Sequence, residues 1–94
     1  MTALKLTKEL ERKARVFDLF GDPTRIRMLQ LLAKKGKVKV SDIAAEVDMT
    51  VACISHHLQL LKDNHVLEAT RDGNSIYYEL TNDKLIQNVI TLIK

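Results

Sequence analysis

Apolar residues recur at helical spacing in several stretches of this chain, and short polar turns separate them. The pattern over residues 4–20 predicts a first amphipathic helix, which Gly21 ends. A second helix begins with Asp22 as its N-cap and Pro23 at its first position, and Gly36 suits its left-handed C-terminal position. Apolar residues surround most of this second helix, so we expect it at the centre of the core.

Residues 41–64 predict a helix-turn-helix unit. Ser41 is expected to cap a short third helix over residues 42–47, and Thr50 to cap a fourth helix over about residues 51–64. Because so few residues join them, the two helices must cross at a steep angle.

The fourth helix has two faces of different chemistry. Val51, Ile54, Leu58 and Leu61 fall on one side at 100° per residue. The opposite side carries small or polar residues, namely Ala52, Ser55, His56, Gln59 and Asp63. Small residues let a helix backbone approach DNA, and Ser, His and Gln side chains can hydrogen-bond to base edges. An ordinary solvated helix face is the alternative interpretation.

Residues 66–80 predict a β-hairpin, or wing, next to a short edge strand over residues 37–40. A two-residue type I′ turn at residues 72–73 pairs Arg71 with Asn74. This register sorts the apolar residues onto one face, namely Leu67, Ala69, Ile76 and Tyr78. A cation near the tip can contact phosphate or enter a minor groove, whereas a solvated arginine is the alternative.

Residues 82–93 predict a fifth helix with a broad apolar surface. One neighbouring core rarely covers such a width, so we infer that the first and fifth helices pack against a second copy in a twofold dimer. The alternative is a helix buried within one subunit. The residues expected at the interface are Leu6, Leu10, Phe17, Leu85, Ile86, Val89, Ile90 and Ile93.

These elements predict a mainly α-helical fold with a small β-hairpin, a winged helix-turn-helix of five helices. A length of 94 residues favours one domain over residues 1–94. No apolar run approaches the ~18 residues that span a bilayer, and the N-terminus lacks a signal-peptide core, so we expect no membrane contact and a cytoplasmic protein. A net charge of +3 favours a polyanion only weakly, because twelve acids accompany fifteen bases.

Little in the chain predicts catalysis or metal binding. Cys53 is the only cysteine, which excludes an internal disulfide and a cysteine-rich zinc site. Cys53, His56 and His57 together offer a thiol- or metal-responsive alternative, but the two histidines diverge by 100° around the helix. We find no phosphate loop or nucleophile elbow, and predict no cofactor and no enzyme.

Four segments resemble, in chain order, motifs of the ArsR/SmtB family of bacterial and archaeal repressors. Residues 20–29 (F-G-D-P-T-R-I-R-M-L) resemble its "G-D-P-T-R" opening, and residues 40–44 (V-S-D-I-A) its third helix. Residues 54–62 (I-S-H-H-L-Q-L-L-K) resemble its "V-S-x-H-L-x-x-L" recognition helix, and residues 71–80 (R-D-G-N-S-I-Y-Y-E-L) its "R-x-G-R-x-x-Y-Y-x-L" wing. The likeness covers about residues 10–90.

The resemblance implies a dimeric winged helix-turn-helix repressor whose first and fifth helices form the dimer interface. The family's inducer sites do not carry over. Lys39 and Ser41 stand where its thiolate site has "C-V-C", and residues 82–84 (N-D-K) replace the start of its helix-five site. The family's thiol switches need a cysteine pair. The chain therefore resembles the subset without an evident ligand site.

The sequence thus predicts a homodimeric repressor that binds double-stranded DNA at an inverted repeat. The residues expected to contact bases or nearby phosphates are Thr50, Val51, Ala52, Ser55, His56 and Gln59. The residues expected to contact the DNA backbone are Arg71, Asn74, Arg25 and Lys37. A winged-helix module that binds another protein is the alternative function. A protein or small-molecule effector is left open.

Overall fold

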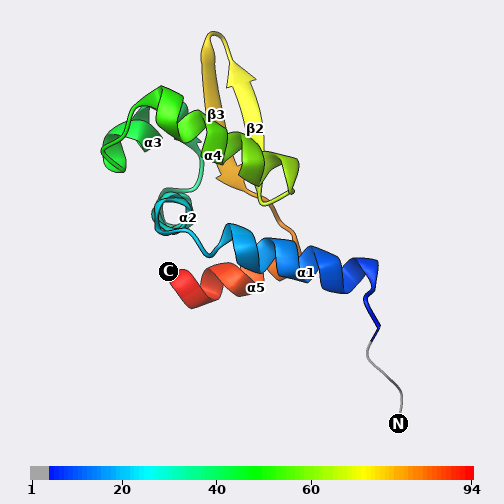
Figure 1. Cartoon of the computed structure of the whole chain (residues 1–94). Coiled ribbons are helices and arrows are strands. Elements are labelled where there is room, and N and C mark those ends of the chain that lie inside the picture. The colour runs from blue at the N-terminus through cyan, green and yellow to red at the C-terminus, as the bar shows by residue number, and fades with distance from the viewer. Residues whose placement is uncertain (1–4) are drawn as a thin grey trace.

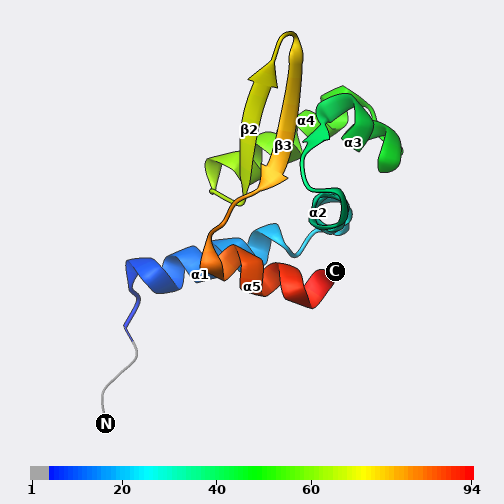
Figure 2. The ribbon, with the colours of Figure 1, turned by 180° about the vertical axis from the view of Figure 1, so that it is seen from behind.

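The computed structural model describes residues 5–94, and residues 1–4, where the predicted first helix begins, lie outside the described part. The elements in chain order are α1 (Lys8–Leu19), α2 (Pro23–Lys35), β1 (Val38–Lys39), α3 (Val40–Glu46), α4 (Val51–Asp63), β2 (Leu67–Asp72), β3 (Ser75–Leu80) and α5 (Lys84–Ile93). Figures 1 and 2 show α1 and α5 side by side at one end of the molecule, and α3, α4 and the β2–β3 hairpin at the other, with α2 between them.

Capping residues fix where the longer helices begin. The Asp22 side chain accepts the N–H of Arg25 at 3.1 Å, and Pro23 follows it, as predicted. At α4, the Thr50 hydroxyl accepts the N–H of Cys53 at 3.1 Å, which confirms that cap as well. The predicted start of α1 is wrong, because Thr7 caps the helix and α1 begins only at Lys8.

The third and fifth helices also differ from the prediction at their starts. Helix α3 begins at Val40 directly after β1, so Ser41 lies inside the helix and does not cap it. The N-cap is Lys39, which forms no side-chain capping bond. Lys39 still pairs with Tyr77 of β3, and the helix starts at the next residue. No loop residue therefore lies between β1 and α3 to act as a cap. Helix α5 begins after Asp83, whose side chain caps it.

A left-handed residue makes the tight turn between α3 and α4. Asp48 has φ 56°, and the Met49 N–H donates to the Ala44 carbonyl at 2.9 Å across the end of α3. This hydrogen bond closes the helix end and turns the chain within two residues of Thr50. The helix-turn-helix geometry is therefore set by the backbone conformation at Asp48.

The sheet is antiparallel in the order β1–β3–β2, and the predicted hairpin register is wrong by two residues. Asp72 pairs with Ser75 and Arg71 with Ile76, so the turn residues are Gly73 and Asn74. Gly73 has φ 63°, as a type II′ turn needs at its first position, whereas a type I′ turn at residues 72–73 needs Asp72 left-handed as well. A two-residue shift keeps every side chain on its predicted face, because strand side chains alternate with period two.

The core lies between α2, α4, α5 and the sheet. Met28, Leu29 and Leu32 of α2 are at most 1% exposed, which confirms the central place predicted for that helix. Ile86, Val89 and Ile90 of α5, predicted for a dimer interface, are instead buried in the core of their own chain, where α5 packs on α2. Burial within one subunit, the alternative interpretation, thus holds for this side of α5.

Candidate nucleic-acid interface

Helix α4 is anchored along one side only. Ile54, Leu58 and Leu61 are completely buried, and the helix packs against β2 of the hairpin. In Figure 1 the helix crosses in front of the hairpin, and in Figure 2 it lies behind it. Its outer face is therefore held rigidly by the core and is left open to a ligand.

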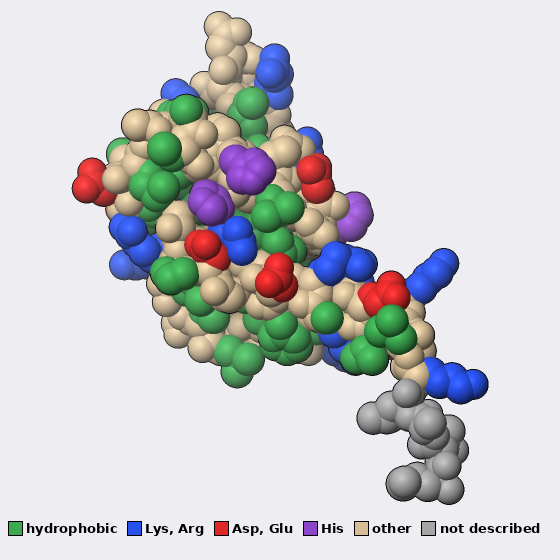
Figure 3. Space-filling model, viewed as in Figure 1, with side chains coloured by type: hydrophobic (Ala, Val, Ile, Leu, Met, Phe, Trp, Pro, Cys, Tyr) green, Lys and Arg blue, Asp and Glu red, His purple; other side chains and the backbone are tan. Residues whose placement is uncertain are grey.

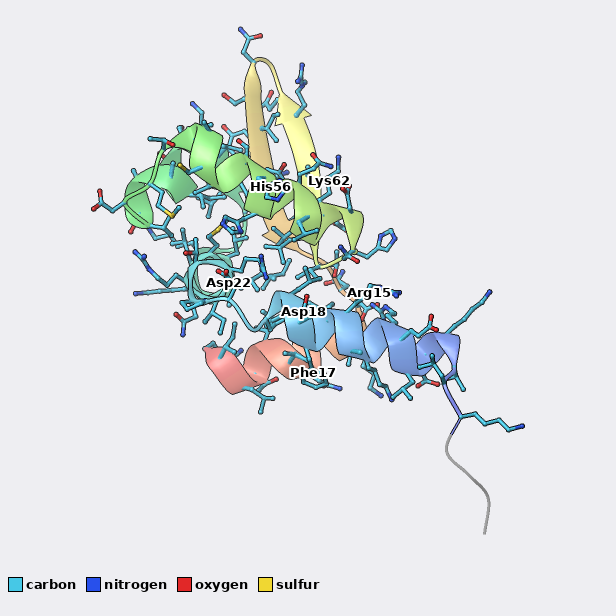
Figure 4. All side chains as sticks on the ribbon, in the orientation of Figure 1. Arg15, Phe17, Asp18, Asp22, His56 and Lys62 are labelled. Carbon is cyan, nitrogen blue, oxygen red and sulfur yellow. The ribbon has the colours of Figure 1, made fainter. Side chains whose placement is uncertain are left out.

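The structure places every residue predicted to contact bases on this outer face or at its edge. Thr50, Val51, Ala52, Ser55, His56 and Gln59 are all exposed. Val51 was also predicted on the apolar side, but it is 46% exposed and does not belong to the core. Figure 4 shows His56 on the face of α4 turned away from the hairpin.

Two polar side chains of the outer face are hydrogen-bonded within α4. The Ser55 hydroxyl donates to the Val51 carbonyl at 2.7 Å, and the Gln59 amide donates to the Asp63 carboxylate at 2.8 Å. These bonds satisfy the donors while the helix is free. If Ser55 and Gln59 exchange these hydrogen bonds for bonds to base edges, the number of bonds stays the same and the free energy of binding changes little. The affinity for DNA then depends on the geometry of the new contacts.

The wing places a cation and an amide near its tip. Arg71 and Asn74 are both exposed. The observed register sets Arg71 opposite Ile76, and so on the same hairpin face as Ala69 and Tyr78, which pack toward the core. Burial raises the pKa of Tyr78, and the Asp63 charge raises it further, so this phenol stays neutral. Arg71 thus lies on the side of the hairpin where α4 is found, beyond the packed part of the sheet.

Arg25, predicted to contact the DNA backbone, is engaged inside the molecule. Its Nε donates to the Leu19 carbonyl at 2.8 Å, and its guanidinium lies 3.5 Å from Nδ1 of His57 on α4. The Arg25 backbone N–H also holds the pKa of Asp22 below its usual value. The side chain therefore links α1, α2 and α4.

This geometry agrees with the comparisons with known proteins. Residues 22–68, half of the 94-residue chain, match the family model described as bacterial regulatory protein, arsR family. The chain belongs to the ArsR family. The family and the fold are those of DNA-binding transcriptional regulators and not of enzymes.

Relatives of the ArsR-family chain extend the match to nearly its whole length. An uncharacterized HTH-type transcriptional regulator of Methanocaldococcus jannaschii is 35% identical over 86 residues, which are 92% of this chain and 96% of the relative. The transcriptional repressor SdpR of Bacillus subtilis is 41% identical over 75 residues, 80% and 81% of the two chains. The homodimeric winged helix-turn-helix DNA-binding domain from Mycobacterium bovis, solved by NMR, matches with a TM-score of 0.79 and 29% identity over 99% of this chain and 86% of that domain.

Lysines of the ArsR-family chain line an open hollow beside the helix-turn-helix. The hollow has a volume of about 840 Å³, and Lys35, Lys37 and Lys39 border it together with Tyr77. Lys37 was predicted to contact DNA, whereas Lys39 was predicted only as a residue that replaces a cysteine of the family's thiolate site. Lys35 ends α2 and Lys39 lies in β1, so the end of the helix and the short strand together bring these lysines to one surface, which strand alternation along the sequence does not predict.

A second hollow, of about 300 Å³, lies between the N-terminal half of α4 and the wing. We call it the wing groove. It is bordered by Lys39, Ser41, Ser55, Leu58, Ser75 and Ile76, among others. Ser41 was predicted only as a helix cap, so its position here was also missed.

Cys53 is exposed at the third position of α4. The His56 and His57 rings lie 6.3 Å apart between centroids and meet edge to face. Among residues 5–94, no group of three or more His, Cys, Asp or Glu side chains is arranged to hold a metal ion. In the same range, no helix has the length and apolar content that a bilayer crossing needs.

At the end of the molecule away from the β2–β3 hairpin, where α1 and α5 lie, several apolar side chains are exposed. Leu10 and Phe17 of α1 are 48% and 57% exposed, and Leu6, just before the helix, is 73% exposed. Leu92 of α5, which was not among the residues predicted at the interface, is 78% exposed, while Leu85 and Ile93 are half-buried. Figure 3 shows hydrophobic side chains gathered along this edge, over α1 and α5. We call this surface the apolar base.

Proposed function

We propose that this ArsR-family regulator is a repressor that binds an inverted-repeat operator as a homodimer. The observation that carries the proposal is the division of α4: one side is completely buried at Ile54, Leu58 and Leu61, and the other is open and carries short polar residues. A helix held this way can enter a major groove without moving the core.

The apolar base supports the homodimer. Exposed leucine and phenylalanine side chains on neighbouring helices cost free energy in water, and a second copy of the same surface covers them symmetrically. The M. bovis domain of the same fold is homodimeric, and the B. subtilis relative is a repressor. A twofold dimer presents two copies of α4, which fit half-sites roughly 10 bp apart between centres.

Selection from random DNA duplexes tests the proposal. We expect enrichment of an inverted repeat with half-site centres roughly one helical turn, ~10 bp, apart, and two chains per duplex by sedimentation. Placing the selected site across a promoter should then lower transcription in vitro when the protein is added. Enrichment of no sequence at all would favour the protein-binding module, and an increase in transcription would exclude the repressor.

A further inference from the structure

The side chain of Arg25 connects two helices that belong to different ends of the molecule. Helix α1 lies at the apolar base, α4 lies at the end with the hairpin, and α2 lies between them (Figure 1). From α2, the Arg25 Nε donates to the Leu19 carbonyl of α1, and the guanidinium Nη1 lies 3.5 Å from Nδ1 of His57 on α4. One half-buried guanidinium thus bridges the apolar base and α4.

The inner part of the Arg25 side chain is held at the corner between α1 and α2. The last carbonyl groups of a helix have no partner within the helix and form its negative end. The carbonyl of Leu19, the last residue of α1, accepts the Arg25 Nε–H at 2.8 Å, which places a cation at this negative end. The Arg25 backbone N–H in turn donates to the Asp22 cap at 3.1 Å. The outer end of the guanidinium is therefore directed at α4 from a fixed corner.

The contact with His57 joins α4 to the other half of the molecule. Helix α4 packs on β2 and α3 through its buried side. Among the side-chain hydrogen bonds within residues 5–94, the contact between Arg25 and His57 alone joins α4 to α1 or α2. Arginine has only donor groups, so Arg25 donates and the imidazole nitrogen accepts. At 3.5 Å this contact is long, so we expect it to bias the orientation of α4 and not to lock it.

We propose that Arg25 is a positioning residue that sets the orientation of α4 relative to α1, with His57 as its acceptor. The inference rests on the proposed function, because it concerns two copies of α4 held by a dimer at the apolar base. In such a dimer, the angle between α1 and α4 in each chain determines the distance between the two copies of α4, and therefore the half-site spacing that fits them. Arg25 then contributes to the choice of operator without touching DNA, in contrast to the backbone contact predicted from the sequence.

The salt dependence of DNA affinity separates this role from a direct phosphate contact. If Arg25→Ala leaves α4 in the fitting orientation for only part of the time, affinity for the selected operator should fall by that fraction, roughly fivefold. Affinity for a random duplex should change much less, because attraction to the DNA backbone does not require one orientation of α4. The slope of log affinity against log salt should equal that of wild type, whereas loss of a phosphate contact reduces it by about 0.9. Lys34→Ala, an exposed lysine on α2, is the matched control and should change neither affinity nor slope.

A double-mutant cycle between Arg25 and His57 tests the contact itself. His57→Ala should produce the same loss of operator affinity as Arg25→Ala, and the double variant should lose no more than either single variant. His57→Asn, whose side-chain oxygen can accept a hydrogen bond in place of Nδ1, should recover most of the affinity. Wild type should bind operators whose half-sites are moved by a single base pair less well than the selected one, whereas Arg25→Ala should distinguish these spacings poorly.

The possible results separate this inference from the proposed function. A reduced salt slope for Arg25→Ala, additive losses in the cycle, or an unchanged preference for spacing would overturn the positioning role and leave the proposed function intact. Failure of the wild-type chain to bind any inverted repeat would overturn both. Urea unfolding curves show separately whether each variant retains the fold. If Arg25→Ala does not fold, His57→Ala and His57→Asn test the same contact from α4.

Discussion

At the residue scale, α4 is flanked by two residues in a backbone conformation that disfavours side chains with a Cβ atom. Asp48 before α4 has φ 56° and His65 after it has φ 61°. Beyond α4, the Val66 N–H donates to the Leu61 carbonyl at 2.9 Å, so His65 occupies the left-handed position that glycine usually takes at a helix end. A residue with a Cβ atom costs about 1–2 kcal/mol in this conformation.

Replacing His65 by glycine should therefore raise the free energy of unfolding, by up to about 1 kcal/mol after the extra entropy of glycine in the unfolded chain is subtracted. Urea denaturation measures the change. Lys62→Gly, three residues earlier inside α4, is the matched control and should lower stability by roughly 0.5–1 kcal/mol. A His65→Gly protein less stable than wild type would show that the imidazole itself stabilises the turn.

The outer face of α4 yields a prediction about specificity. If Ser55 and His56 contact base edges, alanine at either position should reduce discrimination between the selected operator and a random duplex by about 1–3 kcal/mol. Competition binding with both duplexes measures this difference. Thr70→Ala, an exposed change on the opposite face of the wing, should leave discrimination unchanged. Footprints and discrimination identical to wild type for both α4 variants would argue against base contacts by these residues.

At the element scale, the wing presents one basic residue, Arg71, whose position depends on the turn. Arg71→Ala should weaken binding to all sequences alike and reduce the salt slope by about 1, because a phosphate contact carries no sequence information. Gly73→Ala should also weaken binding to all sequences, but for a different reason. Gly73 has φ 63°, so alanine there strains the turn that positions Arg71. Salt titrations of both variants test this, and an unchanged slope for Arg71→Ala would remove the arginine from the interface.

The start of α5 gives a prediction about pH. Desolvation acts to raise the pKa of Asp83, but the Ile86 N–H and the Arg12 guanidinium, 2.7 Å from the carboxylate, outweigh it and lower the pKa below its usual value. A lowered folded-state pKa contributes stability that is fully present above the unfolded value of 3.8 and is lost as the pH falls through the folded value.

Asp83→Asn should keep the helix cap but lose the ion pair, so it should be less stable than wild type by under about 1 kcal/mol at pH 7. This difference should disappear in acid, below pH 3.8, as the wild-type carboxylate becomes protonated. Thermal unfolding of both proteins across pH 2–7 checks the expectation. A difference that stays constant with pH would mean that the charge of Asp83 is not what stabilises the α1–α5 contact.

At the scale of the whole molecule, the apolar base on α1 and α5 lies at the opposite end from the outer face of α4, so the proposed dimerisation and the proposed DNA binding can be changed separately. Figure 4 places Phe17 on the side of α1 away from α4, and Asp18 on the side toward it. Phe17 is 57% exposed in the single chain, so a polar substitution there should not disturb the core.

Phe17→Glu should raise the dimer dissociation constant by roughly thirtyfold or more, if this aromatic residue carries about 2 kcal/mol at the interface. Operator affinity should fall with it, because a monomer contacts one half-site. Sedimentation velocity and operator titration measure the two effects, with Asp18→Ala as the control on the same helix. If Phe17→Glu is still a dimer at the protein concentrations at which wild type is one, the interface lies elsewhere.

The sequence alone determined the elements whose signals are local. A side-chain cap at Asp22 or Thr50 needs only a backbone N–H three residues away, so both caps were correctly predicted. Helical periodicity also predicted the buried side of α4 correctly at Ile54, Leu58 and Leu61, but not at Val51. The faces of the wing were also predictable, because they depend only on alternation along each strand.

Only the tertiary structure decided what depends on distant partners. The hairpin register was settled by the turn at Gly73, and the start of α3 by pairing of Lys39 with β3. From the sequence, the broad apolar surface of α5 could pack within its own chain or against a second copy. In the structure α5 packs on α2, and this contact buries Ile86, Val89 and Ile90 in the core of the chain. A sequence records which residues are apolar or charged, but folding determines which of them share a surface, because contacts between residues far apart in the chain carry no local signal.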